Sequence, residues 1–522
     1  MQWGLPKLVA VGSPSSGSFK VETFLDNGIS FQAILGLPIF TDINSLFLLW
    51  HSITPFGVSI FYWAGLSLFL FSLTTKVNFS KRIIFTFFFI IHFISLSWII
   101  QSFYSGGLGY FFLGIILILL LASFISFLSF SVINIVLKIF HNSQLKFFLL
   151  PLSISIVELL KEFLLGGFPW NPSAIIYYKN LWVLKSLPFV GVYGLGVIIH
   201  LGIGLMLYSL IRLKKKLSLS ISFLVLIIYL SGFFEKEPNV KNIENSLDIL
   251  LIQPNIYESL TDFDVLDNFQ KYEELTLLAL SKTSNVDLII WPEGSLPIDL
   301  NNRPGLLSRL GGILDKDQKL IVGSSAIENN QLFNRFFVID HQGKINQHYD
   351  KQKLVLFGEY VPWVKPLLSR FLNLGMNYIP GDDQSLINLP KNIKAVPMIC
   401  FESIFYYRHI NKNICQSNLV IQISNDSWFG KWYGPQQHLA NSLLRSVEFG
   451  KTLVRSTPSG ISAIIDKKGN IIESIANDKK DFLYYNYPIN QSPSFCPSTL
   501  NIIMLLLFLI FGGSFLYVRI KK

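Results

Sequence analysis

Long apolar runs fill most of the first half of the chain and recur at its C-terminal end. They cover residues 56–75, 83–103, 108–138, 147–165, 187–211, 217–234 and 499–518. Each is close to or above the roughly 20 residues that a helix needs to cross a bilayer. A run at 30–51 is a weaker candidate, because Pro38 and Asp42 interrupt it. The pattern predicts a membrane domain of about seven transmembrane helices over 28–235 and a C-terminal transmembrane helix with a basic tail over 499–522, while residues 1–27 fit no element.

Basic residues form short clusters between these runs. The clusters are Lys76 with Lys81 and Arg82, Lys138 with Lys146, RLKKK at 212–216 and RIKK at 519–522. They fall on every second loop, as the positive-inside rule predicts for cytoplasmic loops. The loop that contains Trp170 and the whole of 236–498 are therefore expected on the opposite side. We expect Trp170 to be an aromatic anchor at the membrane interface.

The composition agrees with a membrane protein. Hydrophobic residues make up 51% of the 522 residues and charged residues only 15%, which is more apolar than a soluble domain of this size requires. The formal net charge of +10 would suit a nucleic-acid partner, but the clusters described above form no continuous basic face. We therefore expect no nucleic-acid partner.

Residues 236–498 carry a different pattern, with short apolar segments between turns and charged stretches. Strands are predicted at 247–255, 286–294, 319–326, 335–340, 394–400 and 418–426, and helices at 266–281 and 436–450. Nearly continuous apolar strands indicate sheets that are covered on both faces. The pattern predicts an α/β soluble domain of layered sheets and helices.

Three residues with suitable chemistry follow predicted strands or a hairpin. Glu293 ends one strand, Cys400 ends another, and Lys351 lies just beyond the hairpin turn at 340–343. Strand ends are where α/β folds gather catalytic groups. A nucleophilic cysteine requires a base and a positive charge, because its thiol is mostly protonated at neutral pH. Taken singly, a strand-end Glu or a loop Lys is more often a solvated charge, and a buried Cys is more often structural.

Other chemistry finds less support in the sequence. The eight histidines show neither an HExxH motif nor a close grouping with cysteine, so no metal and no cofactor are expected. Cys415 and Cys496 lie 80 residues apart without a disulfide framework, and we expect them to be inert thiols.

The motifs around these candidates resemble a known family. WPE (291–293), LVLFGEYVP (354–362) and CFE (400–402) are similar to motifs of the nitrilase-like carbon–nitrogen hydrolases. Together with the flanking helices, ELLKEFLLGGFPWNP (158–172) and NDSWFG (425–430) resemble the apolipoprotein N-acyltransferases. The resemblance covers about residues 50–520 and implies a polytopic α-helical membrane domain plus a nitrilase-like αββα sandwich over 236–498.

The resemblance also assigns roles. Cys400 would be the nucleophile, Glu293 the general base and Lys351 the charge-stabilising lysine. Glu359 would be an auxiliary acid, and Glu402 either a supporting carboxylate or a group that pairs with a cation to shape the pocket. Phe401 stands where the family commonly has Tyr, so an aromatic contact is kept while a hydroxyl is lost.

Other departures from the family pattern concern the loops. Thr261 and Asp262 stand where the family often carries a Lys-Trp pair, and Leu356 replaces a usual Pro. Trp363, Leu367 and Leu368 would either form a lid that dips into lipid or pack on the domain.

The implied reaction is an acyl transfer in two steps. Cys400 would take an acyl chain from a membrane phospholipid and pass it to the α-amino group of a diacylglyceryl-cysteine lipoprotein. The protein would then lie in the bacterial cytoplasmic membrane as a multi-pass protein with its catalytic domain on the periplasmic side. Two alternatives remain: a membrane-tethered amidase of small substrates, and a noncatalytic receptor or transporter.

Overall fold

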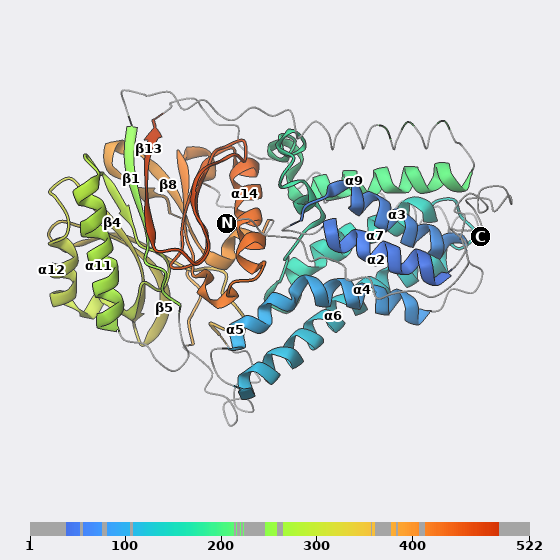
Figure 1. Cartoon of the computed structure of the whole chain (residues 1–522), viewed down its shortest axis with the longest axis horizontal. Coiled ribbons are helices and arrows are strands. Elements are labelled where there is room, and N and C mark those ends of the chain that lie inside the picture. Colours follow the sequence, from blue (N-terminus) through green and yellow to red (C-terminus); the bar gives the residue numbers. More distant parts are fainter. Residues whose placement is uncertain are drawn as a thin grey trace, which may run out of the picture.

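The computed structural model of the chain has a helical lobe and an α/β lobe that lie against each other (Figure 1). It describes residues 38–52, 56–75, 81–104, 108–212, 216, 220, 223, 246–257, 265–356, 358–360, 377–382, 385–406 and 413–489. The predicted helix at 499–518, nearly all of the run at 217–234, and the residues Thr261, Asp262, Trp363, Leu367 and Leu368 lie outside these ranges.

The helical lobe forms where the apolar runs predict it. Its main helices are α2 (Pro38–Ser52), α3 (Ser59–Thr75), α4 (Lys81–Leu96), α6 (Leu108–Phe140), α7 (Lys146–Phe163) and α9 (Leu187–Ile211). Within the described residues, the segments Lys81–Phe103, Gly109–Phe140 and Leu187–Ile211 are long and apolar enough to cross a membrane. The total number of spans stays a prediction.

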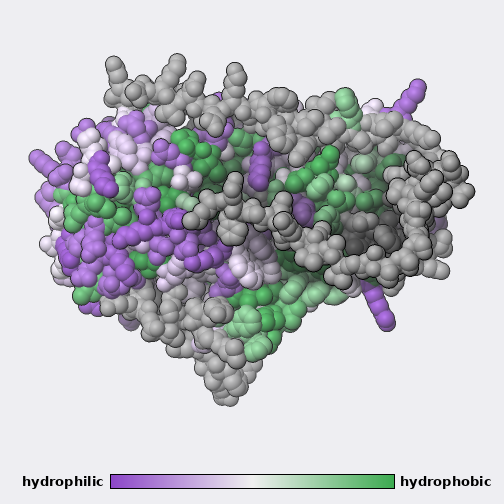
Figure 2. Space-filling model, in the orientation of Figure 1, coloured by the Kyte–Doolittle hydropathy of each residue, from purple (hydrophilic) through white to green (hydrophobic). Residues whose placement is uncertain are grey.

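Two features of this lobe are typical of a membrane domain. Large apolar side chains are exposed along α6, at Phe112, Ile116, Leu120, Phe127 and Ile135. Figure 2 accordingly shows hydrophobic surface in the region of α6 and largely hydrophilic surface over the α/β lobe. Such an exposed apolar face is costly in water but not against lipid tails.

The α/β lobe contains two sheets. The first has the order β13-β1-β2-β4-β5-β6, with β3 paired to β4, and the second has the order β12-β11-β10-β9-β8-β7. The first sheet consists of β1 (Ser246–Gln253), β2 (Leu288–Ile290), β3 (Leu296–Asp299), β4 (Lys319–Glu328), β5 (Gln331–Asp340), β6 (Ile345–Asp350) and β13 (Asp481–Pro488). The second consists of β7 (Ile387–Asn388), β8 (Lys394–Ile399), β9 (Leu419–Ile423), β10 (Thr452–Ser456), β11 (Ser462–Ile465) and β12 (Ile471–Ile475).

The layers follow from which apolar side chains share a core. Leu251 of β1 and Ile421 of β9 belong to one buried cluster, so the two sheets face each other. Helices α11 (Val265–Lys282) and α12 (Pro304–Gly311) cover the outer face of the first sheet. Helix α14 (Gly434–Phe449) covers the second. The predicted αββα sandwich is confirmed.

Helix α14 also joins the two lobes. Leu443 and Val447 of α14 belong to the same buried cluster as Met398 of β8 and Val192 and Ile199 of α9. The helix is therefore packed between the second sheet and the membrane domain, as Figure 1 shows. The helical lobe supplies the outermost layer on that side of the α/β lobe.

Candidate active site

The carboxyl ends of parallel strands gather the predicted residues. β2 runs parallel to β1 and β4, and β9 runs parallel to β8 and β10. Glu293 follows β2, and Cys400 follows β8. Gly323 of β4 allows this approach, because a Cβ there would lie 2.5 Å from the Cα of Glu293. Lys351 comes directly after β6, on the other side of the same site.

Lys351 is the centre of a buried ion-pair network. Its Nζ lies 2.9 Å from Oε1 of Glu293 and 2.8 Å from Oε1 of Glu359. The side-chain amide of Asn334 donates to the same two oxygens, over 2.8 and 2.7 Å. Burial alone would lower the pKa of Lys351, but the two carboxylates raise it well above its usual value. The lysine is therefore a fixed positive charge.

The other carboxylate oxygens are held by main-chain amides. Oε2 of Glu293 accepts a hydrogen bond from the Asn425 amide at 2.8 Å, and Oε2 of Glu359 accepts one from the Val355 amide at 2.7 Å. These bonds fix the orientation of both carboxylates around Lys351. The structure thus brings together the three predicted groups Glu293, Lys351 and Glu359. Asn334 was missed by the sequence reasoning, although the polar pair Asn334 and Arg335 within the otherwise apolar stretch LFNRFFVI was a usable signal.

Cys400 occupies a strained position at the start of a short 3₁₀ turn, Cys400–Ile404. Its φ of 48° lies in the left-handed region, which residues other than glycine seldom adopt. The side chain is 6% exposed. Burial raises the pKa of the Cys400 thiol and Glu293 raises it further, while Lys351 and a hydrogen bond from Ser424 oppose them only in part. The resting side chain of Cys400 is therefore a thiol, which would require a base in order to act as a nucleophile.

This protonation state predicts a pH profile. We expect the rate of Cys400 alkylation by iodoacetamide to keep rising, by nearly tenfold per pH unit, from pH 7 to pH 9, because the thiolate fraction still grows there. The rate is measured by intact-protein mass spectrometry. The Cys400→Ser variant corrects for labelling elsewhere. A plateau below pH 8 would instead show a preformed thiolate.

Glu402 supports the site from behind the turn. Its Oε2 accepts from the Ile399 amide at 2.7 Å, and its Oε1 accepts from the Tyr349 hydroxyl at 2.8 Å and the Gln352 amide at 2.7 Å. Burial raises its pKa to about 7. Glu402 therefore links the segment after Lys351 to the Cys400–Ile404 turn, through hydrogen bonds from main-chain amides and from the Tyr349 hydroxyl.

Phe401 and Trp170 belong to an aromatic cluster at the border of the two lobes. The ring of Phe401 lies 6.0 Å from that of Phe168 and 5.2 Å from that of Phe405. Trp170 is 2% exposed, and its Nε1 donates to Oε1 of Gln437 on α14 over 2.6 Å. The prediction that Trp170 is an interfacial anchor was therefore wrong, because its ring is packed inside the protein.

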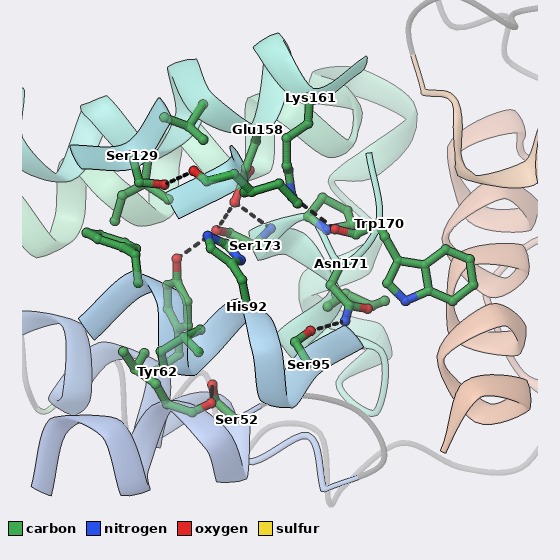
Figure 3. Close-up of a pocket in the computed structure, with 18 of the residues that line it drawn as sticks. Ser52, Tyr62, His92, Ser95, Ser129, Glu158, Lys161, Trp170, Asn171 and Ser173 are labelled. Carbon is green, nitrogen blue, oxygen red and sulfur yellow. Dashed lines mark hydrogen bonds between the residues drawn. The ribbon is translucent and has the colours of Figure 1, made fainter. Parts of the chain in front are cut away.

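Polar side chains of the membrane domain hold this loop. Lys161 donates to the Trp170 carbonyl at 3.0 Å, and Asn171 donates to Ser95 Oγ at 2.8 Å, at the edge of a cavity of about 110 Å³. Figure 3 shows these contacts, with the indole of Trp170 turned towards α14. Glu158 also lines the cavity and accepts from the Ser173 amide at 2.9 Å. The cavity belongs to the membrane domain, and Cys400 does not line it.

Cys415 and a possible metal site beside Cys400 are two further features to compare with the predictions. Cys415 is disulfide-bonded, so the expectation that it is an inert thiol was wrong; Cys496 lies outside the described residues. Within the described part of the chain, only Cys400, Asp426 and His438 place possible metal-ligand atoms within 4.8 Å of one another. Asp426 already pairs with the guanidinium of Arg455, which opposes a cation there.

Comparison with known proteins gives the class and then the family. Residues 250–491 match the family model of the carbon-nitrogen hydrolases, in agreement with the αββα fold and the Glu293, Lys351 and Cys400 cluster. Residues 45–205 match the model of the apolipoprotein N-acyltransferase N-terminal domain. The apolipoprotein N-acyltransferase of Wigglesworthia glossinidia brevipalpis is 32% identical, over 72% of this chain and 76% of that protein. The chain belongs to the apolipoprotein N-acyltransferase family, and it is a membrane protein.

Other relatives share the same name. The apolipoprotein N-acyltransferases of Allorhizobium ampelinum and Rhizobium meliloti are 29% and 30% identical over 65% and 62% of this chain. These alignments span 66% and 64% of the relatives' own length, just under two thirds.

Proposed function

We propose that the protein transfers an acyl chain from a membrane phospholipid to the N-terminal amine of a diacylglyceryl-cysteine lipoprotein. One observation carries the proposal: a buried Glu, Lys and Cys cluster lies in a domain whose second sheet shares its core with membrane helices. A domain seated in this way is suited to substrates that are anchored in the bilayer. The match of residues 45–205 favours this function over the amidase alternative.

In the first step, Glu293 accepts the proton of the Cys400 thiol as Sγ attacks the ester carbonyl of the phospholipid. Lys351 stabilises the negative charge that develops on the carbonyl oxygen. The carbon–oxygen bond then breaks, and Glu293 returns the proton to the departing lysophospholipid alcohol. An acyl thioester on Cys400 remains.

In the second step, the free amine of the lipoprotein attacks the thioester. Glu293 accepts a proton from the amine, the carbon–sulfur bond breaks, and Glu293 returns this proton to the departing thiolate of Cys400. Glu359 holds Lys351 in place through both steps, since its Oε1 lies 2.8 Å from the ammonium. The products are an amide on the lipoprotein and the regenerated enzyme.

The proposed location is the bacterial cytoplasmic membrane, spanned several times, with the catalytic domain on the periplasmic side. The alternation of basic clusters along the sequence supports this orientation. The disulfide at Cys415 supports it independently, because disulfides persist mainly in oxidising compartments.

The test is intact-protein mass spectrometry of the purified protein with a phospholipid that carries a deuterated acyl chain. We expect a mass gain of one labelled chain that hydroxylamine removes, as a thioester requires. A diacylglyceryl-cysteine peptide should discharge this adduct, whereas the same peptide with an acetylated amine should not. Absence of the adduct together with hydrolysis of small amides would support the tethered amidase instead.

A further inference from the structure

A second set of polar side chains lies behind Cys400, and the mechanism above does not use it. Gln422 of β9, His438 of α14 and Arg455 of β10 are all fully buried, at 0% exposure. Burying polar groups of this size is unfavourable unless they are hydrogen-bonded. Their hydrogen bonds form two chains, both of which start at Arg455 and end at the nucleophile turn.

The first chain ends on the main chain of the nucleophile. Nη1 of Arg455 donates to Ser442 Oγ at 3.0 Å, and Ser442 Oγ donates to Oε1 of Gln422 at 2.7 Å. The amide Nε2 of Gln422 then donates to the carbonyl oxygen of Cys400 at 3.1 Å. Each hydrogen bond in this chain orients the next side chain. The position of the Cys400 carbonyl therefore depends on Arg455.

The second chain reaches the turn through an imidazole. Nη2 of Arg455 binds Asp426, whose Oδ1 lies 2.9 Å from Nδ1 of His438. Nε2 of His438 lies 3.2 Å from Ser403 Oγ and 3.2 Å from the Cys400 carbonyl oxygen. Both contacts are with the turn that begins at the nucleophile.

The protonation states of this chain follow from its charges. Burial would raise the pKa of Asp426, but Arg455 and His438 hold it well below its usual value, so Asp426 is a carboxylate. Burial and Arg455 lower the pKa of His438, so the ring is neutral. Asp426 and the Cys400 carbonyl oxygen both only accept, so the single proton of the neutral ring donates to Asp426 from Nδ1 or to the Cys400 carbonyl from Nε2, while the Ser403 hydroxyl can bond to Nε2 in either tautomer.

The turn requires such support because Cys400 is strained. A residue with φ of 48° stays in that conformation only if its surroundings hold it there. The rings of Trp170 and Phe429 lie 5.7 and 5.3 Å from that of His438, which keeps water from the network. We propose that Arg455, through Gln422 and through Asp426 with His438, positions the Cys400 turn for attack; these are positioning residues that do not touch the substrate.

The inference rests on the proposed function, and its test compares two identical substitutions. Gln422→Met removes the donor to the Cys400 carbonyl. Gln253→Met is the matched control: Gln253 is also 0% exposed but bonds to Ala476, Lys479 and Ser462, away from the turn. We expect Gln422→Met to lower the single-turnover rate of thioester formation at least tenfold, per folded molecule, and Gln253→Met to lower it less than threefold.

A second variant and a second readout keep the test decisive. Ser442→Ala breaks the first chain between Arg455 and Gln422. We expect it to lower the rate of thioester formation, but by less than Gln422→Met does. Alkylation of Cys400 by iodoacetamide needs no acyl donor, and its rate should change at least fivefold in Gln422→Met but not in Gln253→Met. If the wild-type protein forms no thioester, the proposed function is contradicted. The alkylation rates of Gln422→Met and Gln253→Met still test the hydrogen-bond network. Equal alkylation and acylation rates in Gln422→Met and Gln253→Met would overturn the inference.

Discussion

Replacing Cys400 with alanine is expected to abolish acyl transfer while the protein remains folded. The alanine side chain differs from cysteine only by the sulfur atom, which is buried and within the electrostatic influence of Glu293 and Lys351, and the turn keeps its main-chain hydrogen bonds. Removal of an enzyme's nucleophile costs several orders of magnitude, and we expect a decrease of at least about 10⁴-fold in the transfer rate. The rate is measured as labelled chain transferred to a diacylglyceryl-cysteine peptide.

Two observations would separate this result from a general defect. The thermal unfolding temperature of Cys400→Ala should stay within about 3 °C of the wild-type value, and retention of labelled phospholipid should be unchanged. Cys400→Ser keeps a nucleophilic atom and should accumulate at most a small amount of an ester that resists hydroxylamine. Acyl transfer by Cys400→Ala at one hundredth of the wild-type rate or more would contradict the assignment of the nucleophile.

Among the substitutions considered for this protein, Lys351→Met is expected to lower the free energy of unfolding the most. The side chain of Lys351 is 1% exposed and its ammonium lies within 3 Å of both Glu293 and Glu359, so its removal leaves one buried and one partly buried carboxylate without a cation. Breaking a buried pair in this way costs about 3–5 kcal/mol.

The matched control is Lys271→Met. Lys271 pairs with Asp267 on the surface of α11, where both side chains are about half exposed, and such pairs contribute about 0–1 kcal/mol. Thermal unfolding of the two variants in the same detergent measures the difference, and the thioester assay measures the loss of charge stabilisation. Similar unfolding temperatures for Lys351→Met and Lys271→Met would contradict the assigned network.

The sequence predicted the groups that follow strands, for a physical reason. Strand ends are visible in the alternation of apolar runs and turns, so Glu293 and Cys400 could be placed at one edge before their contacts were known. The helices of the membrane domain were equally visible, because a bilayer requires long apolar runs. The predicted strands and the helices over 266–281 and 436–450 are all present within a few residues of their predicted limits.

The buried polar network was not visible in the sequence. Gln422 is the single polar residue of β9 and Arg455 the single charged residue of β10, where such residues usually indicate a solvated face, yet both are completely buried. Helix α14 has few large apolar residues, although nearly all of its side chains are buried, because many of them bond to one another and to the turn. Such placement depends on contacts between distant segments. The disulfide at Cys415 was missed for the same reason.

Helix α14 limits how the two lobes can move. Two domains joined by a small polar contact usually swing against each other, whereas a large apolar interface suppresses such motion. Here one helix is part of both interiors, and the bonds from Trp170 to Gln437 and from the Val192 amide to Glu448 fasten it to the membrane side. The α/β lobe therefore sits as a rigid platform rather than on a hinge, and under the proposed function lipid substrates would have to be exchanged without a swing of this whole lobe.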